Sequence, residues 1–280
     1  MDKFLWGLSV FASRWRNRLR YARKIPSTYR NWWALLLPKL GVSVVLETRN
    51  GLRYLVRPGT TDLAVVNEAV MLNPYLAAGY LTLPEDGVVL DVGANVGDFT
   101  MQAARNCPRG RVIAVEPVSE HARMIALQTL LNRVENVVCV PVALGNREGE
   151  IEIHIEGGHS SAYWGEGKSE KVRLTTLAQL LLELRIERVT LLKLDCEGAE
   201  WDILPAAEEI LPRIQQICME FHCDRDWTQE KLASWLRERG YKVWHTPGPW
   251  NGLLWAVRRD DPKPLTPGFA VAEDLIAERP

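Results

Sequence analysis

The segment 88–100 constrains the fold of this chain of 280 residues more than any other. An apolar stretch, Val88–Val92, contains one acid, Asp91, and runs into a loop with two glycines, Gly93 and Gly97, before a helical pattern starts. Glycine lets the backbone turn sharply and approach a ligand closely, and the N-terminus of the following helix then faces the bound group. The segment predicts the first strand, loop and helix of a doubly wound sheet, where nucleotides bind.

The alternation of strand and helix continues along most of the remaining chain. Continuous apolar strands separated by helices favour a mainly parallel sheet covered on both faces, so we expect an α/β fold. The expected strands are Val88–Val92, Arg111–Val115, Val137–Val142, Val189–Leu194, Ile214–Phe221, Tyr241–His245 and Gly252–Val257. The expected helices are Asp98–Asn106, Ser119–Asn132, Leu177–Leu184, Glu200–Leu211 and Thr228–Arg239. An added hairpin over Glu150–Ile155 and Lys171–Leu174 interrupts this order.

The pattern divides the chain into four parts. Residues 1–40 are a basic, aromatic-rich N-terminal helical segment, and residues 41–86 are a hairpin and a helix that lead into the core. Asn50-Gly51 predicts the tight turn of the hairpin, and the helix is expected over Leu63–Tyr80, kinked or split at Pro74. Residues 87–260 form the main α/β domain, and residues 261–280 form a proline-rich tail.

Charge is distributed unevenly along the chain. Residues 1–40 hold nine basic residues and one acid, a net charge of +8, whereas the other 240 residues carry −9. An acidic body is not built to grip nucleic acid, so we expect no nucleic-acid partner. Tryptophan and arginine in one segment suit a membrane interface or an anionic partner. The alternative is a basic helix that packs on the acidic body or at a dimer interface.

Cysteine usage and the N-terminal pattern bear on the cellular setting. Five scattered cysteines without a CxxC pair argue against a disulfide framework and a structural zinc site. The apolar run Phe4–Ala12 is too short to cross a bilayer, and the basic stretch Arg14–Lys24 that follows it argues against a signal peptide. We expect a cytoplasmic protein, with peripheral membrane contact as one option.

A second ligand signal is Glu116-Pro117, nineteen residues after Gly97 at the end of the next expected strand. An acid in this place accepts hydrogen bonds from the ribose hydroxyls of an adenosine. The carboxylate of Asp91 would repel a pyrophosphate but attract a cation, and the loop lacks the GxGxxG spacing. The charge argument therefore favours S-adenosylmethionine, a sulfonium without phosphate, over NAD. A nicotinamide-dependent oxidoreductase is the disfavoured rival.

Six motifs together resemble the FkbM-type S-adenosylmethionine-dependent methyltransferases. They are Arg57-Pro-Gly-Thr-Thr-Asp62, Asp91-Val-Gly-Ala-Asn-Val-Gly97, Ile113-Ala-Val-Glu116-Pro117, Val142-Ala-Leu-Gly145, Leu192-Lys-Leu-Asp195-Cys-Glu197-Gly-Ala-Glu200 and Glu220-Phe-His222. The resemblance implies a class I methyltransferase fold, which is Rossmann-like, with a doubly wound, mainly parallel sheet of seven strands. It also implies O-methylation, often of a sugar hydroxyl on a glycan or natural product, with S-adenosylhomocysteine as the second product.

The resemblance also implies a cofactor site. The implied cofactor-binding residues are Asp91, Gly93, Ala94, Asn95, Gly97, Phe99, Thr100, Glu116, Pro117, Ala143, Leu144 and Asp195. Within this set, the glycine loop would line the methionine part of the cofactor, Glu116 would hold the ribose, and Ala143 would flank the adenine.

Methyl transfer to a hydroxyl needs a general base. Asp195 and His222 follow two strands that are expected to be neighbours, and we expect both residues to be catalytic. Histidine has the better intrinsic pKa for a base near neutrality. The candidate substrate contacts are Glu197, Glu220 and Ser161.

Two alternatives remain open from the sequence. Asp195, Glu197 and Glu220 would form an oxygen-rich magnesium site in a catechol-type O-methyltransferase. The same acids are also favourable at the start of a helix, so magnesium is not favoured and no metal ligand is assigned. The other alternative is a non-catalytic module that binds an adenosine ligand and docks to a glycosylation complex through the basic N-terminus.

Overall fold

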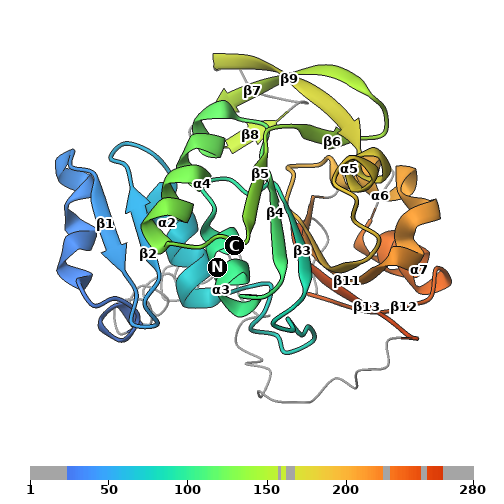
Figure 1. Cartoon of the computed structure of the whole chain (residues 1–280), viewed down its shortest axis with the longest axis horizontal. Helices are drawn as coiled ribbons and strands as arrows, with labels where there is room; N and C mark the ends of the chain where they lie inside the picture. The colour runs from blue at the N-terminus through green and yellow to red at the C-terminus, as the bar shows by residue number, and fades with distance from the viewer. Residues whose placement is uncertain (1–23, 157–158, 162–167, 223–227, 247–250, 261–280) are drawn as a thin grey trace, which may run out of the picture.

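A computed structural model describes residues 24–156, 159–161, 168–222, 228–246 and 251–260. Its centre is a sheet of seven strands in the order β12-β13-β11-β10-β3-β4-β5 (Figure 1). The strands are β3 (Val88–Val92), β4 (Arg111–Val115), β5 (Val137–Val140), β10 (Val189–Leu194), β11 (Ile214–His222), β12 (Tyr241–His245) and β13 (Asn251–Arg258). Neighbours from β5 to β11 pair in parallel, and β13 is antiparallel to both β11 and β12. The predicted α/β fold with a mainly parallel sheet is confirmed.

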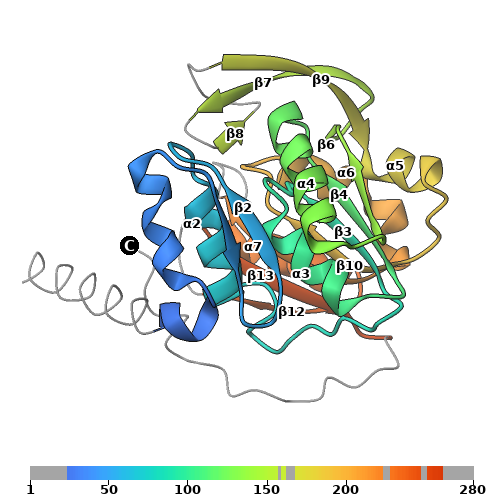
Figure 2. The ribbon, with the colours of Figure 1, turned by 60° about the vertical axis from the view of Figure 1, so that its left-hand side comes forward.

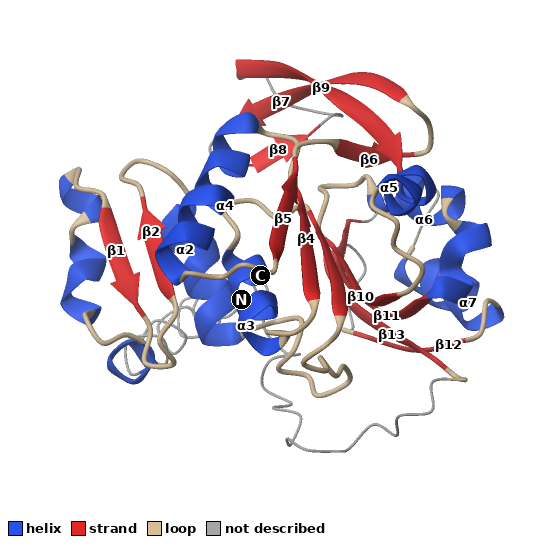
Figure 3. Ribbon diagram, viewed as in Figure 1, coloured by secondary structure: helices blue, strands red, loops and turns tan. Residues whose placement is uncertain are grey.

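Helices cover both faces of this sheet (Figure 3). One side carries α3 (Asp98–Asn106) and α4 (Ser119–Asn132), and the other carries α5 (Leu177–Glu183), α6 (Glu200–Ala206) and α7 (Gln229–Glu238). The central strands are apolar on both faces because both faces are covered, as Val89, Leu90 and Leu192 illustrate with no exposed surface. This double cover leaves the carboxyl ends of the strands as the edge where a ligand can enter.

Two predicted helices are too long. The helix expected over 63–80 consists of α2 (Asp62–Asn67) and a π-helical turn, η3 (Glu68–Leu72), and it stops at Asn73, which has a left-handed φ of 47° and precedes Pro74. The helix expected over 200–211 ends at Ala206 and continues as the 3-10 segment η4 (Glu208–Arg213). Pro205 lies within α6 and Pro212 within η4. Because proline has no backbone N–H, each interrupts the hydrogen bonds of a continuous α-helix.

The added hairpin is part of a second sheet, which lies at the top of Figure 1. Its order is β6-β9-β7-β8, with β6 (Ala143–Gly145), β7 (Gly149–Glu156), β8 (His159–Ser161) and β9 (Lys168–Thr176). The predicted pairing of 150–155 with 171–174 is correct within longer strands, since Glu150 faces Arg173 and Ile151 faces Val172. The strand expected over 137–142 ends at Val140, because the chain crosses there to the second sheet.

The N-terminal extension lies beside α4 and α3 (Figure 2). It consists of η1 (Trp32–Leu36), η2 (Pro38–Leu40), β1 (Val44–Glu47), β2 (Arg53–Val56), α2 and η3. The predicted hairpin is confirmed, with Val44 paired to Val56. Within the described ranges, no helix has the length and apolar character that a membrane span requires.

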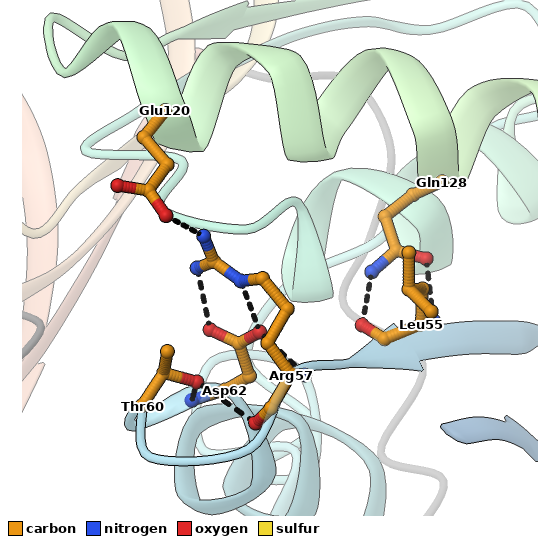
Figure 4. Close-up of polar contacts among 6 residues, drawn as sticks. All are labelled: Leu55, Arg57, Thr60, Asp62, Glu120 and Gln128. Atoms are coloured by element: carbon orange, nitrogen blue, oxygen red, sulfur yellow. Dashed lines mark hydrogen bonds and ion pairs between the residues drawn. The ribbon is translucent and has the colours of Figure 1, made fainter. Parts of the chain in front are cut away.

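Polar contacts fasten this extension to α4 (Figure 4). The guanidinium of Arg57 donates to both carboxylate oxygens of Asp62, at 2.8 and 2.9 Å, and also reaches Glu120 of α4. The amide of Gln128 accepts from Leu55 N at 2.9 Å and donates to Leu55 O at 3.0 Å, as a neighbouring strand would. These contacts fix the extension and therefore the segment 73–86 that enters the core.

Candidate active site

A cavity of about 660 Å³ opens at the carboxyl ends of β3, β4, β10 and β11. The predicted site residues in its lining are Gly93, Asn95, Glu116, Pro117, Ala143, Leu144, Asp195, Glu197, Glu220 and His222. They come from four strand ends and from β6, which lie far apart in the sequence. The parallel topology therefore brings together most of the residues that the motifs indicated.

The glycine loop brings two strand ends unusually close. Gly93 and Asn95 have left-handed φ values of 72° and 49°. A Cβ atom on Gly93 would lie 1.8 Å from the carbonyl oxygen of Asp195. Only glycine fits at this position, and the absence of a side chain lets the loop after β3 touch the end of β10.

Glu116 holds the glycine loop in place. It is almost fully buried, and its two carboxylate oxygens accept hydrogen bonds from the backbone N–H groups of Asn95 (2.8 Å) and Val118 (2.9 Å). His121 Nδ1 lies 3.6 Å from Glu116 Oε1. The acid predicted at this place therefore faces the cavity with its position already fixed by the backbone.

A buried lysine is the electrostatic centre of the site. Lys193 Nζ lies 3.0 Å from Asp91 Oδ1 and 3.9 Å from Asp195 Oδ2, and it donates to Gly93 O at 2.8 Å. Burial lowers the pKa of Lys193, but the neighbouring carboxylates outweigh burial and raise it above the ordinary value. Lys193 therefore carries its charge inside the protein and compensates two acids.

Some residues implied for the cofactor site lie outside the cavity lining. They are Asp91, Ala94, Gly97, Phe99 and Thr100. Asp91 is fully buried, where it pairs with Lys193 and accepts a hydrogen bond from Thr100 Oγ1 at 2.5 Å. Asp91 therefore forms an ion pair behind the loop, and its expected contact with the cofactor stays a prediction. Phe99 packs instead against Tyr75, with the ring centres 5.6 Å apart.

Tyr75 reaches the site from the segment 73–86, which follows the N-terminal extension, and the sequence patterns did not indicate it. Its hydroxyl donates to Asp195 Oδ2 at 2.8 Å, and its backbone oxygen accepts from Trp255 Nε1 at 2.9 Å. Burial, followed by the charge of Asp195, raises the pKa of Tyr75 well above its ordinary value. Tyr75 therefore remains a hydrogen-bond donor to Asp195. The one local signal was Pro74, where the helix was expected to kink or split.

His222 lies between two glutamates. Its Nε2 is 3.5 Å from Glu197 Oε2, and its Nδ1 is 3.5 Å from Glu200 Oε1. Burial lowers the pKa of His222, but the contact with Glu200 and the charges of both glutamates outweigh it and raise the pKa to about 9. The two carboxylates therefore favour the charged imidazolium, in which neither ring nitrogen has a free lone pair for a proton. That His222 is catalytic stays a prediction, and its geometry is also that of a counter-ion to the two glutamates.

Glu200 explains the shape of the turn that presents Asp195. Its carboxylate accepts from the backbone N–H groups of Cys196 (2.7 Å) and Gly198 (3.0 Å). In the same turn, Glu197 and Gly198 have left-handed φ values of 52° and 105°. The Asp-x-Glu-Gly-x-Glu pattern thus encodes a tight turn whose backbone N–H groups are accepted by its own last glutamate, Glu200. From the sequence alone, this structural role of the acids could not be separated from a role in metal or substrate binding.

Two predictions concern Ser161 and a metal. Ser161 ends β8, and its side chain lies outside the described residues. In the described ranges, no cluster of three or more His, Cys, Asp and Glu side chains is arranged to hold a metal ion. Glu197 is instead engaged with His222. Asp195, Glu197 and Glu220, the acids of the magnesium alternative, all line the cavity, and that alternative stays a prediction.

The chain is similar to known proteins in sequence and in structure. The sequence model described as Methyltransferase FkbM domain matches residues 91–243, more than half of the chain. The chain is 26% identical to 31-O-demethyl-FK506 methyltransferase FkbM of Streptomyces tacrolimicus, over 75% of this chain and 88% of that protein. It is 27% identical to AMB antimetabolite synthetase AmbE of Pseudomonas aeruginosa, over 76% of this chain but only 12% of that protein. A crystal structure of methyltransferase FkbM from Methylobacillus flagellatus aligns with a TM-score of 0.48 at 16% identity, covering 70% and 53% of the two chains.

Proposed function

The chain belongs to the FkbM family of methyltransferases, and from this premise we propose that it transfers the methyl group of S-adenosylmethionine to a hydroxyl. The proposed acceptor is a hydroxyl on a glycan or a glycosylated natural product. The name of the Streptomyces tacrolimicus relative describes an O-demethyl substrate, which supports an oxygen acceptor. The observation that carries the proposal is the Asp195 carboxylate, which Tyr75 and Lys193 fix at the wall of the cavity.

The residues of the cavity fit a cationic donor that contains adenosine. Asn95 Oδ1 is buried and has no hydrogen-bond partner among the described residues, so it offers an acceptor to a bound ligand. Glu116 keeps lone pairs for ribose hydroxyls after accepting its two backbone hydrogen bonds. S-Adenosylmethionine would supply the reactive methyl group on its sulfonium, together with a neutral thioether leaving group.

In the proposed reaction, Asp195 receives the proton of the acceptor hydroxyl. Tyr75 and Lys193 engage Oδ2 and hold the carboxylate in one orientation, while 32% of the side chain is exposed. Fixing the hydroxyl behind the methyl group lowers the entropic cost of an in-line displacement. The hydroxyl oxygen gains the methyl group as the carbon–sulfur bond breaks, and its proton passes to Asp195. His222 and Glu200 act as positioning residues for the turn that carries Asp195.

Substitution of Asp195 tests this assignment. We expect Asp195→Asn to lower kcat about 100-fold or more, because the general base is lost, while calorimetry shows little change in the affinity for S-adenosylmethionine. The matched control is Asp86→Asn, at an exposed turn before β3. Full turnover by Asp195→Asn would reject Asp195 as the base.

The acceptor is identified with methyl-labelled S-adenosylmethionine and an extract of cell glycans and lipids. Mass spectrometry of the labelled product is expected to place the methyl group on a sugar hydroxyl. A methyl group on nitrogen or carbon would contradict the proposal. Turnover that persists in excess EDTA would reject the catechol-type alternative, and binding of NAD in place of S-adenosylmethionine would overturn the cofactor assignment.

A further inference from the structure

Exposed apolar side chains gather in one short segment of the N-terminal extension. Among the described residues, the large hydrophobic side chains with the most solvent contact in this segment are Trp32, Trp33, Leu36, Leu40, Val42 and Val45. We call these six residues the amino-terminal patch. Trp33 is 59% exposed and Leu40 is 74% exposed. The patch lies on and beside the blue helical turns next to β1, at the left edge of Figure 1.

The patch belongs to a segment that is otherwise well packed. Ala34 and Leu35 lie within the same 3-10 turn as Trp32 and Trp33, and both are buried in a cluster with Tyr29. In β1, Val44 and Leu46 are buried while Val45 between them is exposed. Buried side chains therefore anchor the segment to the extension, while two indoles and four aliphatic side chains of the same segment are exposed. Large apolar side chains exposed together in one short segment are typical of an interaction site.

The sequence around the patch carries charge of one sign. After Asp2, the next acid is Glu47, and the 44 residues from 3 to 46 contain nine basic residues. The rest of the chain is acidic, with a net charge of −9 beyond residue 40. Lys39 lies within the patch segment and is exposed. A partner that covers the patch therefore meets apolar side chains together with the positive charge of Lys39.

We propose that the amino-terminal patch seats the protein on an anionic lipid surface. Indole rings prefer the boundary between headgroups and acyl chains, aliphatic side chains gain from burial there, and each nearby lysine or arginine is attracted to anionic lipid. A second copy of the chain is the less suitable occupant, because a two-fold contact would bring the exposed Lys39 side chains of both copies to one interface. Docking on lipid is independent of the proposed methyl transfer, since no patch residue lines the cavity.

Vesicle flotation with the full chain tests the proposal. The protein is expected to float with vesicles of phosphatidylcholine and phosphatidylserine, and to float much less with phosphatidylcholine alone. The double variant Trp33→Ser/Leu40→Ser is expected to lower the apparent affinity by about tenfold or more, because burial of a large apolar side chain is lost. The matched control is Leu182→Ser on α5, a leucine that is 69% exposed elsewhere on the molecule. Equal flotation of the double variant and the wild type would overturn the proposal.

Charge is tested separately. Lys39→Gln is expected to weaken binding to the anionic vesicles about fivefold, which corresponds to about 1 kcal/mol for one basic residue. The control is Lys171→Gln in β9, which is also exposed and should bind like the wild type. Sedimentation velocity without lipid tests whether a second copy of the chain covers the patch instead. The proposal would be contradicted if the wild type formed a dimer that the patch variants dissociate and did not bind vesicles. Methyltransferase turnover of each variant verifies that it is folded, so a failure of docking stays separate from a failure of the proposed function.

Discussion

Two clusters in this protein use the same chemistry, one cation between two carboxylates, in different surroundings. Lys193 lies between Asp91 and Asp195 with 4% of its side chain exposed, and it forms part of the cavity wall. Arg57 lies between Asp62 and Glu120 with 19% of its side chain exposed, at the contact of the extension with α4. The first cluster sets the charge of the site, and the second fixes a segment that delivers Tyr75 to it. A charged motif thus indicates an ion pair, whereas the burial of that pair decides what it controls.

The largest loss of stability is expected from removing the cation of the first cluster, Lys193. Lys193→Met leaves Asp91 buried without its counter-ion, so we expect the free energy of unfolding to fall by about 5 kcal/mol, near the upper limit for a broken buried pair. Urea denaturation measures this loss. Lys171→Met, at an exposed position of β9, is the control and should have little effect. A loss no larger than that of the control would mean that Asp91 is compensated in another way.

Removal of the cation in the second cluster is expected to cost less. In Arg57→Leu, Asp62 stays almost fully buried and loses both hydrogen bonds from the guanidinium, which lowers the free energy of unfolding by about 3 kcal/mol. Glu120→Gln should cost well under 1 kcal/mol, because Glu120 is 65% exposed. Thermal and urea unfolding of both variants rank the contributions. Equal effects would contradict the role of burial in this comparison.

A third prediction concerns the contribution of His222 to the pH dependence of the free energy of unfolding. Its pKa of about 9 in the folded protein is above the ordinary 6.5. A raised pKa stabilises the fold fully below pH 6.5, and this contribution is lost as the pH rises through 9. We expect the free energy of unfolding to fall by about 2 kcal/mol over this range, less than the shift alone would give because the ring is partly exposed. Urea titrations of His222→Gln should lack this component of the fall, and the control variant His245→Gln, outside the cavity lining, should keep it.

A smaller loss of stability than those from removing a cation is expected at Tyr75, which donates to the Asp195 carboxylate of the first cluster. Tyr75→Phe removes one hydrogen bond to a carboxylate and keeps the aromatic packing, so the free energy of unfolding should fall by about 1.5 kcal/mol. Because Asp195 would lose its orienting donor, we also expect a drop in kcat of about tenfold with KM nearly unchanged. Tyr80→Phe, a partly buried tyrosine stacked on Trp244, is the matched control. Unchanged kcat in Tyr75→Phe would show that Lys193 alone suffices to hold Asp195.

The sequence predicts best what short-range pattern encodes. The strand, glycine loop and helix over 88–106 occur as expected, since apolar periodicity and the glycines lie within one continuous segment. Helix ends were predicted less well, because Asn73 stops a helix through a left-handed φ that the neighbouring apolar pattern does not reveal. The crossing after Val140 was likewise missed, since a second sheet competes for the residues that follow.

The chemistry of the site depends on contacts that no local pattern contains. Tyr75 and Asp195 are 120 positions apart and meet only in the fold. The acidic neighbours of His222 are supplied by the turn after β10, and they raise its pKa above the intrinsic value. Asp91 was correctly placed next to the loop, but its pairing with Lys193 could not be read from spacing, because the two lie on neighbouring strands.

The origin of Tyr75 has a consequence for how such proteins diversify. The recognisable signature of the family begins at residue 91, yet the hydroxyl that steers Asp195 comes from residue 75, upstream of it. A fragment cut at residue 87 would retain every signature motif from Asp91 onward and would lack that hydroxyl. Exchange of the upstream segment would thus change the hydrogen-bond donor to Asp195 and leave the residues that match the family model unchanged.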